Sequence, residues 1–258
     1  MVEVTSSINK KHDEKDEYWH RVIERKPVRL LVFSIIVIAI GGAVEIIPTM
    51  AVKSNIKPIA QVKPYTPLEL EGRDIYIREG CVQCHSQMVR PLRFETERYG
   101  EYSKAGEFVY DHPFLWGSKR TGPDLAREGG LRSDSWHYGH LIIPKQWSPG
   151  SIMPAYPWLA EDDLNTEYLE KKITVMQSLG VPYPEGYEKE ALADLKEQAK
   201  EIASNIVNDL SKEESNVSVD EIANKEIVAI IAYLQRLGTD IKAVPAEAGD
   251  EEIETSMK

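Results

Sequence analysis

Apolar residues are spread unevenly along the chain, and one stretch is far more apolar than the rest. Residues 30–44 read LLVFSIIVIAIGGAV without a charge, and the run continues to residue 52 with only Glu45 and Pro48 as interruptions. At about 1.5 Å per residue, a helix over residues 30–52 is roughly 34 Å long, enough for a bilayer core of about 30 Å. The pattern therefore predicts a transmembrane helix over residues 28–52, with a buried core helix as the alternative. Glu45 lies near one end of the span, and we assign it no role.

Basic residues flank this segment asymmetrically. Seven precede it (Lys10, Lys11, Lys15, Arg21, Arg25, Lys26 and Arg29), whereas three follow closely (Lys53, Lys57 and Lys63). Cytoplasmic flanks carry the excess of Lys and Arg, so we expect residues 1–27 in the cytoplasm and the remainder outside. A cleaved signal peptide is the alternative. A long charged lead-in and the lack of a small-x-small cleavage site after the apolar run favour a retained anchor.

Beyond the membrane segment, helical periodicity alternates with irregular stretches. Residues 53–67 contain three prolines and no apolar period, which predicts an extended linker. Apolar positions predict a short helix over residues 68–79 that Gly80 ends. Residues 90–160 are rich in Gly, Pro, Trp and Tyr, and such long loops indicate that something other than the chain fills the core.

The last third of the chain has the clearest amphipathic pattern. Apolar residues at positions 192, 195, 199, 202, 206 and 210 predict a helix. Ser218 and Glu221 form a capping-box pattern that predicts the start of one further helix, which Gly238 ends. The acidic, Ala-rich residues 242–258 are expected to be disordered.

Charge and composition narrow the function classes. Hydrophobic residues make up 42% of the chain and charged residues 28%, which excludes wholesale disorder. The net charge of −11 argues against nucleic-acid binding, and residues 185–258 carry eight basic against 18 acidic residues. This acidic region is either a solvated face or a surface that steers a basic electron donor. Two cysteines cannot build a disulfide scaffold.

The sequence CVQCH at residues 81–85 is the most specific short motif. Cys81 and Cys84 lie one helical turn apart and are placed to add to the two vinyl groups of a haem, while His85 ligates the iron. A redox-active dithiol would normally follow a strand in a βαβ unit, and a zinc site would need a further pair of ligands, neither of which is apparent. The motif predicts one covalently bound haem c.

An electron-transferring haem usually has a sixth iron ligand. The candidates are Met88, Met153, Met176, His112, His137 and His140. Met88 is too close to His85 to reach the opposite face of the haem, and Met176 follows a core-like apolar pattern. Met153 lies in the irregular segment PGSIMP, where the following proline favours an extended backbone, and we predict it as the ligand. The alternative is a buried loop methionine.

Other residues are candidates to support the haem. The sequence TGPDL at residues 121–125 lies between the two predicted ligands, and the carbonyl of Pro123 is a candidate acceptor for the free ring nitrogen of His85. Arg90 and Arg93, together with Lys119 and Arg120, are candidates to neutralise the haem propionates, with solvent exposure as the alternative.

Three blocks carry a resemblance to a known family: CVQCHSQMVRPLRFETERYG, DHPFLWGSKRTGPDLAREGG and SIMPAYPWL. They resemble the mono-haem, membrane-anchored subunit (subunit II, or O subunit) of cbb3-type cytochrome c oxidases, over residues 20–160 and again in EIVAIIAYLQRLGTDI. The resemblance implies one haem c, bound by Cys81 and Cys84 and ligated by His85 and Met153. It also implies a subunit of the bacterial cytoplasmic membrane that passes electrons from a dihaem cytochrome c subunit, or a soluble cytochrome c, to a catalytic haem-copper subunit.

The expected fold is mainly α. A single transmembrane helix precedes a class I-like cytochrome c domain over residues 68–241, with long loops and an acidic helical insertion at about residues 185–220. The residues offer no nucleophile–base pair, acid pair or second metal site, so we expect no catalytic site of the chain's own. The anchored cytochrome of a nitric oxide reductase, a haem-based sensor with an open sixth position, and a brace for a catalytic subunit remain as alternatives.

Overall fold

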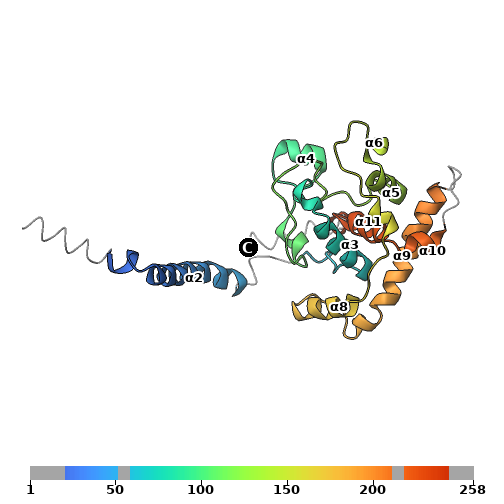
Figure 1. Cartoon of the computed structure of the whole chain (residues 1–258). Helices are drawn as coiled ribbons and strands as arrows, with labels where there is room; N and C mark the ends of the chain where they lie inside the picture. The colour runs from blue at the N-terminus through green and yellow to red at the C-terminus, as the bar shows by residue number, and fades with distance from the viewer. Residues whose placement is uncertain (1–20, 52–58, 211–217, 244–258) are drawn as a thin grey trace, which may run out of the picture. The chain divides into compact units, whose positions relative to one another are not determined.

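The computed structural model of the chain describes residues 21–51, 59–210 and 218–243 (Figure 1). The chain divides into two compact units, Met1–Lys57 and Pro58–Lys258, and each is described here by itself. The described residues are mainly helical, with only one isolated antiparallel bridge, between Asp163 and Lys225. This confirms the expectation of a mainly α fold.

The first unit is represented by helix α2, Pro27–Ala51. Its stretch Pro27–Thr49 is long and apolar enough to cross a membrane, and none of its most apolar window is buried in the protein. Side chains such as Val28, Val37 and Ile38 are left largely exposed. The single apolar helix expected from the sequence is therefore present. The basic residues before position 21 lie outside the described residues.

The second unit is organised around the crossing of two helices that lie far apart in the sequence. Helix α3 (Pro67–Arg78) and helix α11 (Glu226–Arg236) pack closely, and most of α11 is buried. At the crossing, a Cβ atom on Gly72 would overlap the carbonyl of Ala229 and lie 2.9 Å from the Cβ atom of Tyr233. Only glycine therefore permits the two backbones to approach this closely.

Local sequence signals set both ends of α3, of which the stop at Gly80 was predicted. Thr66 and Glu69 form a capping box in which each side chain binds the other residue's backbone N–H, and Pro67 occupies the first turn. At the other end, Gly80 adopts a φ of 72°, a conformation that side chains disfavour. The chain therefore leaves the helix directly before Cys81.

The acidic segment is part of the core rather than an appendage to it. Helix α9 (Ala191–Leu210) packs against α3, α5 (Asp134–Ile142), α8 (Leu169–Ser178), α10 (Val219–Ala223) and α11. Leu195, Ile202 and Ile206 from its predicted apolar stripe are buried. An amphipathic helix buries one face and solvates the other, so the acidic residues lie on the outside of a structural element.

The single helix predicted after Ser218 is wrong, because the structure has two helices, α10 and α11, separated at Asn224–Lys225. Ser218 also makes no side-chain cap. The break arises because this part of the chain pairs with a distant backbone segment. Leu164 N–H donates to the Asn224 carbonyl (2.8 Å), and Glu226 N–H donates to the Asp162 carbonyl (3.1 Å). These bonds take the place of the hydrogen bonds that would continue one helix through Asn224 and Glu226.

The remaining elements are short and are separated by irregular chain, as expected for residues 90–160. They are the 3₁₀ turns η2 (Cys81–Gln83), η3 (Ala105–Phe108), η4 (Tyr187–Lys189) and η6 (Asp240–Ala243), and the helices α4 (Arg93–Tyr99), α6 (Pro144–Trp147) and α7 (Trp158–Glu161). Residues 59–66 begin the second unit and pack against the rest of it. The Tyr65 carbonyl, for example, accepts a hydrogen bond from the Tyr183 hydroxyl at 2.6 Å. We expect residues 242–258 to be disordered, and most of them lie outside the described residues.

The crossing of α3 and α11 leads to a prediction of unusual sign. In an ordinary helix interior, replacing Gly by Ala stabilises by roughly 0.5–1 kcal/mol. Gly72→Ala should instead lower the free energy of unfolding by about 3 kcal/mol, because the new methyl group collides with Ala229 backbone. Denaturant unfolding followed by circular dichroism measures the difference. A neutral or stabilising Gly72→Ala would show that the helices do not pack as described.

Candidate haem site

The CxxCH motif forms a tight turn at the end of α3. Cys81 begins the 3₁₀ turn η2, and its carbonyl accepts from the N–H groups of Cys84 (3.1 Å) and His85 (2.9 Å). Both cysteines are free; Cys81 is half-buried against the core, whereas Cys84 is exposed. The turn thus holds two thiols and an imidazole close together at the edge of the core.

The chemistry of Cys81 argues against a redox-active dithiol. Burial, followed by the negative charge of Glu79, raises the pKa of the Cys81 thiol to about 12. Redox-active cysteines have lowered pKa values, because the thiolate is the reactive form. In addition, the described residues contain no group of three His, Cys, Asp or Glu side chains arranged to hold a metal ion. The raised pKa of Cys81 therefore disfavours a redox-active dithiol.

The TGPDL segment is joined to the residues around His85 by backbone pairing. Gly122 N–H donates to the Cys84 carbonyl (3.0 Å), and Leu125 N–H donates to the Ser86 carbonyl (2.8 Å). The Asp124 carboxylate accepts from the Ser86 hydroxyl (2.6 Å) and from Met88 N–H (3.0 Å). These bonds fix the loop directly beside the imidazole.

The loop determines how the His85 ring is held. Nδ1 lies 2.8 Å from the Pro123 carbonyl, which can only accept, so Nδ1 carries the proton and Nε2 keeps its lone pair. A Cβ atom on Gly122 would overlap Cε1 and lie 2.7 Å from Nδ1. Gly122 therefore makes space for the ring. The imidazole is locked in the tautomer that an iron ligand requires.

Met153 lies in the irregular segment between α6 and α7. Its side chain is half-buried and packs against the core, and its N–H donates to the Ser151 hydroxyl at 3.2 Å. Met176, by contrast, is buried among core side chains on α8. Burial raises the pKa of Tyr156 most, and the neighbouring residues Cys81 and Cys84 raise it further. The segment that carries Met153 therefore passes beside the CxxCH turn.

Helix α5 brings two histidines toward the same region. For His137, the Ser133 carbonyl lies 3.0 Å from Nδ1, whereas Nε2 is buried without a hydrogen bond and lies 3.3 Å from a Glu128 carboxylate oxygen. His140 stacks on Trp136, and its Nδ1 is buried without a hydrogen-bond partner. Burial lowers the pKa of His140, and the positive charge of Arg132 adds to the effect.

These observations agree with a bound haem. Two thiols, an oriented imidazole and a nearby thioether form the donor set of a haem c site. Gly122 leaves room for the imidazole, and the unpaired Nδ1 of His140 is the kind of buried polar atom for which a bound group supplies a partner. The residues present therefore fit the group that the motif predicts.

The arginines proposed for the propionates have carboxylate partners within the protein. The Arg90 guanidinium donates to Glu95, and the Arg93 guanidinium donates to Glu97 at 2.7 Å on the exposed face of α4. Arg120 is more enclosed and donates to Ser86 (2.6 Å), Glu95 (2.7 Å) and Asp124 (3.1 Å). Lys119 is exposed. Contacts of Arg90 or Arg93 with propionates stay a prediction.

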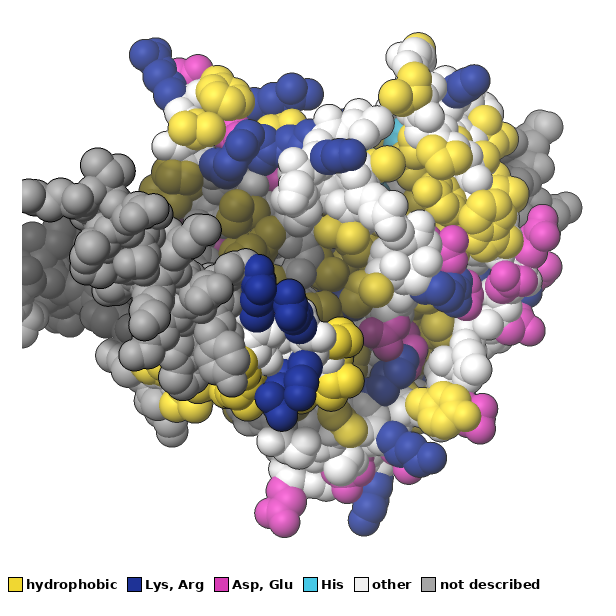
Figure 2. Space-filling view, turned by 60° about the vertical axis from the view of Figure 1, so that its left-hand side comes forward, with side chains coloured by type: hydrophobic (Ala, Val, Ile, Leu, Met, Phe, Trp, Pro, Cys, Tyr) yellow, Lys and Arg dark blue, Asp and Glu magenta, His cyan; other side chains and the backbone are white. Residues whose placement is uncertain are grey.

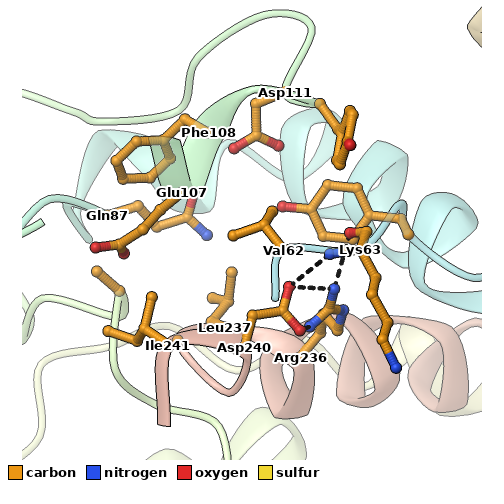
Figure 3. A pocket seen from close by; sticks show the side chains of 14 residues that line it. Val62, Lys63, Gln87, Glu107, Phe108, Asp111, Arg236, Leu237, Asp240 and Ile241 are labelled. Atoms are coloured by element: carbon orange, nitrogen blue, oxygen red, sulfur yellow. Dashed lines mark hydrogen bonds and ion pairs between the residues drawn. The ribbon is translucent and has the colours of Figure 1, made fainter. Parts of the chain in front are cut away.

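A small cavity elsewhere in the unit is distinct from this site. It has a volume of about 60 Å³, room for very few water molecules, and lies between residues 62–65, the loop around Asp111 and the end of α11 (Figure 3). The ion pair between Arg236 and Asp240 closes one side of it. Its lining includes neither the cysteines nor His85.

Several apolar side chains in and next to the Met153 segment are exposed to solvent. Ile152 is 78% exposed, and Ile143 and Trp158 are also exposed. Figure 2 shows hydrophobic side chains gathered into patches rather than scattered singly over the face in view. Large exposed apolar patches commonly mark surfaces that contact other proteins.

The fold and the site together define a helical haem-binding domain joined to a potential membrane helix. The family model "Cytochrome C oxidase, mono-heme subunit/FixO" matches residues 20–241. The chain belongs to this family of mono-haem cytochrome c oxidase subunits, which confirms the resemblance to the cbb3-type subunit. No curated protein matches the chain.

Sequence reasoning overlooked three features that shape the site. Gly122 was noted only as part of TGPDL, although its position directly before Pro123 was a signal that the backbone approaches closely. His140 was considered as a ligand but not as a residue whose Nδ1 is buried without a partner. The hydrogen bond between Trp158 and Glu79, at 3.1 Å, has no local signal because the residues are 79 positions apart.

The contact between Gly122 and His85 is open to a direct test. Gly122→Ala should displace the imidazole, because the methyl group would occupy the position of the ring. We expect the variant to lose the low-spin absorption spectrum of the haem while keeping the covalent haem stain. Thr121→Ala is the control, and its spectrum should match the wild type. An unchanged Gly122→Ala spectrum would contradict the described position of His85.

Glu95 predicts a pH-dependent stability. Its side chain is fully buried, and the hydrogen bonds from Arg120 and then Arg90 lower its pKa from 4.5 to about 2. A lowered folded-state pKa stabilises the fold above the unfolded-state value, and this contribution is lost as the pH falls from about 4.5 to about 2.

Glu95→Gln should therefore lower the free energy of unfolding by about 3 kcal/mol at neutral pH, because it leaves two arginines without their buried partner. The difference between the wild type and the variant should shrink as the pH falls below 4.5. Denaturant unfolding at a series of pH values measures it. A difference that stays constant down to pH 2 would show that Glu95 is not ionised in the folded protein.

Proposed function

We propose that the chain relays single electrons through one haem c, bound covalently by Cys81 and Cys84, to the catalytic subunit of a cbb3-type oxidase. The observation that carries the proposal is the fixed imidazole of His85, with Nδ1 held by the Pro123 carbonyl at 2.8 Å. Membership of the mono-haem oxidase subunit family supports the assignment to electron transfer. When bound, the haem supplies a reversible one-electron redox couple.

The side chains have distinct tasks in this proposal. Cys81 and Cys84 attach the haem by thioether bonds, and His85 offers Nε2 to the iron. The Pro123 carbonyl keeps the proton on Nδ1 and strengthens the basicity of Nε2. Met153 would supply its thioether as the second iron ligand, and thioether ligation raises the reduction potential relative to a second histidine. With both ligands supplied by the chain, the site would serve electron transfer and not oxygen binding.

The chain has no catalytic site of its own in this proposal. Oxygen reduction belongs to the haem-copper subunit, and electrons arrive from a dihaem cytochrome c subunit or a soluble cytochrome c. The exposed apolar side chains around Ile152 support a role for this region in contacting another subunit. The acidic face of α9 offers a second surface, suited to a basic donor.

We further propose that α2 anchors the chain in the bacterial cytoplasmic membrane. The asymmetry of Lys and Arg around the helix favours a cytoplasmic N-terminus and a haem unit on the outer side. On that side the haem unit meets electron donors in the periplasm or on the outer face of the cytoplasmic membrane. Neither a separate substrate pocket nor nucleic acid is involved.

Substitution of the predicted thioether ligand tests the proposal. Met153→Leu keeps the side-chain volume, so the fold should survive with a loss of less than about 1.5 kcal/mol. The oxidised wild type should show a weak sulfur-to-iron charge-transfer band that the variant lacks. The reduced variant should bind carbon monoxide, and its potential should fall if a histidine such as His140 replaces sulfur.

The controls separate the ligand from the mode of attachment. Met88→Leu and Met176→Leu should leave the charge-transfer band unchanged, whereas Cys84→Ala should weaken or abolish the haem stain of the denatured chain. A band that survives Met153→Leu would refute the ligand assignment. A wild-type haem that is already five-coordinate and binds carbon monoxide would refute electron transfer and favour a haem-based sensor.

A further inference from the structure

The segment that carries Met153 has no regular structure of its own to hold the side chain in place. It leaves the short helix α6 at Trp147 and enters α7 at Trp158, and Met153 lies between them. Within it, Ser151 N–H donates to the Ser148 carbonyl (3.0 Å). Tyr156 N–H donates to the Leu141 carbonyl (2.9 Å), which ties the segment to the end of α5. These bonds shape the segment, but they do not connect it to the CxxCH turn.

One hydrogen bond makes that connection. The indole Nε1–H of Trp158 donates to Oε2 of Glu79 at 3.1 Å. Glu79 is the residue that caps the C-terminal end of α3, two positions before Cys81. The bond therefore joins the segment that carries the thioether to the element that carries the cysteines and His85. Its acceptor is a carboxylate, and charge-assisted hydrogen bonds are stronger than neutral ones.

The Glu79 carboxylate is itself held in place. Its Oε1 accepts from Nε of Arg78 at 2.8 Å, which leaves Oε2 for Trp158. The guanidinium of Arg78 also forms two hydrogen bonds to Glu226 at the start of α11, one of them 2.7 Å long. The Glu79 side chain is only 14% exposed. The acceptor of the indole is thus fixed to the α3–α11 crossing rather than free on the surface.

Aromatic packing restricts the donor as well. The rings of Tyr156 and Trp158 contact each other edge to face with their centroids 5.2 Å apart. Tyr156 lies near Cys81 and Cys84, and both raise the pKa of its hydroxyl group. Leu159, directly after Trp158, is fully buried. The start of α7 is therefore anchored by one buried apolar side chain, one ring contact and one hydrogen bond.

We infer that Trp158 and Glu79 are positioning residues that keep the Met153 thioether on the iron by closing its loop against the CxxCH turn. The inference rests on the proposed role of Met153. Opening this loop exchanges the indole–carboxylate bond for bonds to water, so the bond adds to the free energy that holds the sulfur in place. Neither residue contacts the iron.

The affinity of the oxidised full-length chain for added imidazole measures loop closure. Imidazole binds the iron only after the sulfur leaves, so its apparent dissociation constant reflects the fraction of molecules in which the loop is open. Trp158→Phe keeps an aromatic ring and removes the N–H group. It should lower the apparent dissociation constant for imidazole about tenfold, the effect of losing a hydrogen bond to a charged group. Glu79→Ala should do the same from the other partner.

Two comparisons separate loop closure from a general loss of structure. Trp116→Phe is the matched control, because Trp116 is 37% exposed and Trp158 is 40% exposed. It should bind imidazole as the wild type does. In a Met153→Leu background there is no sulfur to displace, so adding Trp158→Phe should leave the imidazole affinity unchanged. The double variant Trp158→Phe/Glu79→Ala should match either single variant, since both remove the same bond.

The outcomes distinguish this inference from the proposed function. If Met153→Leu keeps the sulfur-to-iron charge-transfer band, Met153 is not the ligand and both proposals fail. If Met153→Leu loses that band but Trp158→Phe binds imidazole as Trp116→Phe does, the ligand stands and the positioning role is refuted. Tightening by Trp158→Phe that persists in the Met153→Leu background also refutes it. Should Trp158→Phe not retain haem, Glu79→Ala provides the same measurement.

Discussion

The close contact between α3 and α11 at Gly72 is the constraint on which the haem-binding unit depends. Because no side chain intervenes at Gly72, the backbone of α3 rests directly on Ala229. The end of α3 carries Glu79 and Cys81, so the position of the motif follows from this crossing. A second link reinforces it, since Gln87, just after His85, donates to the Tyr233 hydroxyl at 2.9 Å. Side chains on both sides of the CxxCH turn are thereby tied to α11.

From this base, the ring of His85, the proposed haem ligand, is oriented by a backbone carbonyl rather than by another side chain. A carbonyl cannot donate, so the Pro123 oxygen fixes the imidazole tautomer at every pH at which the ring is neutral. A carboxylate in the same position would add a charge beside the iron. The neutral carbonyl orients the ring without that charge, which suits a haem that must accept and release an electron with little rearrangement.

The parts of the fold that follow from local pattern were predictable from the sequence. The apolar run of α2, the capping box and glycine stop of α3, and the stripe of α9 are all encoded within each segment. The break at Asn224 was not, because it depends on backbone bonds to Asp162 and Leu164, some 60 positions earlier.

The candidate site also combines features that a local sequence pattern predicts with features that depend on distant contacts. The CxxCH motif and the TGPDL block could be recognised as short strings, whereas the pairing of Trp158 with Glu79 is visible only in three dimensions. The propionate contacts proposed for Arg90 and Arg93 came from charge alone, and charge does not reveal which carboxylates lie nearer. Glu95, fully buried between Arg90 and Arg120, gave no sign of its burial in the sequence.

The partnership of α3 with α11 also determines the order in which the unit can form. Gln87 and Tyr233 are 146 positions apart, and Arg78 and Glu226 are 148 apart. Contacts of such long range form late, because the chain between the partners must first be available and then be ordered. A ribosome that has released residues 81–85 has most of the unit still to synthesise, and α3 lacks its packing partner throughout that interval. Cys81, which is half-buried in the folded unit, is therefore fully accessible to whatever attaches a group to it only until the last helix arrives and closes the core around α3.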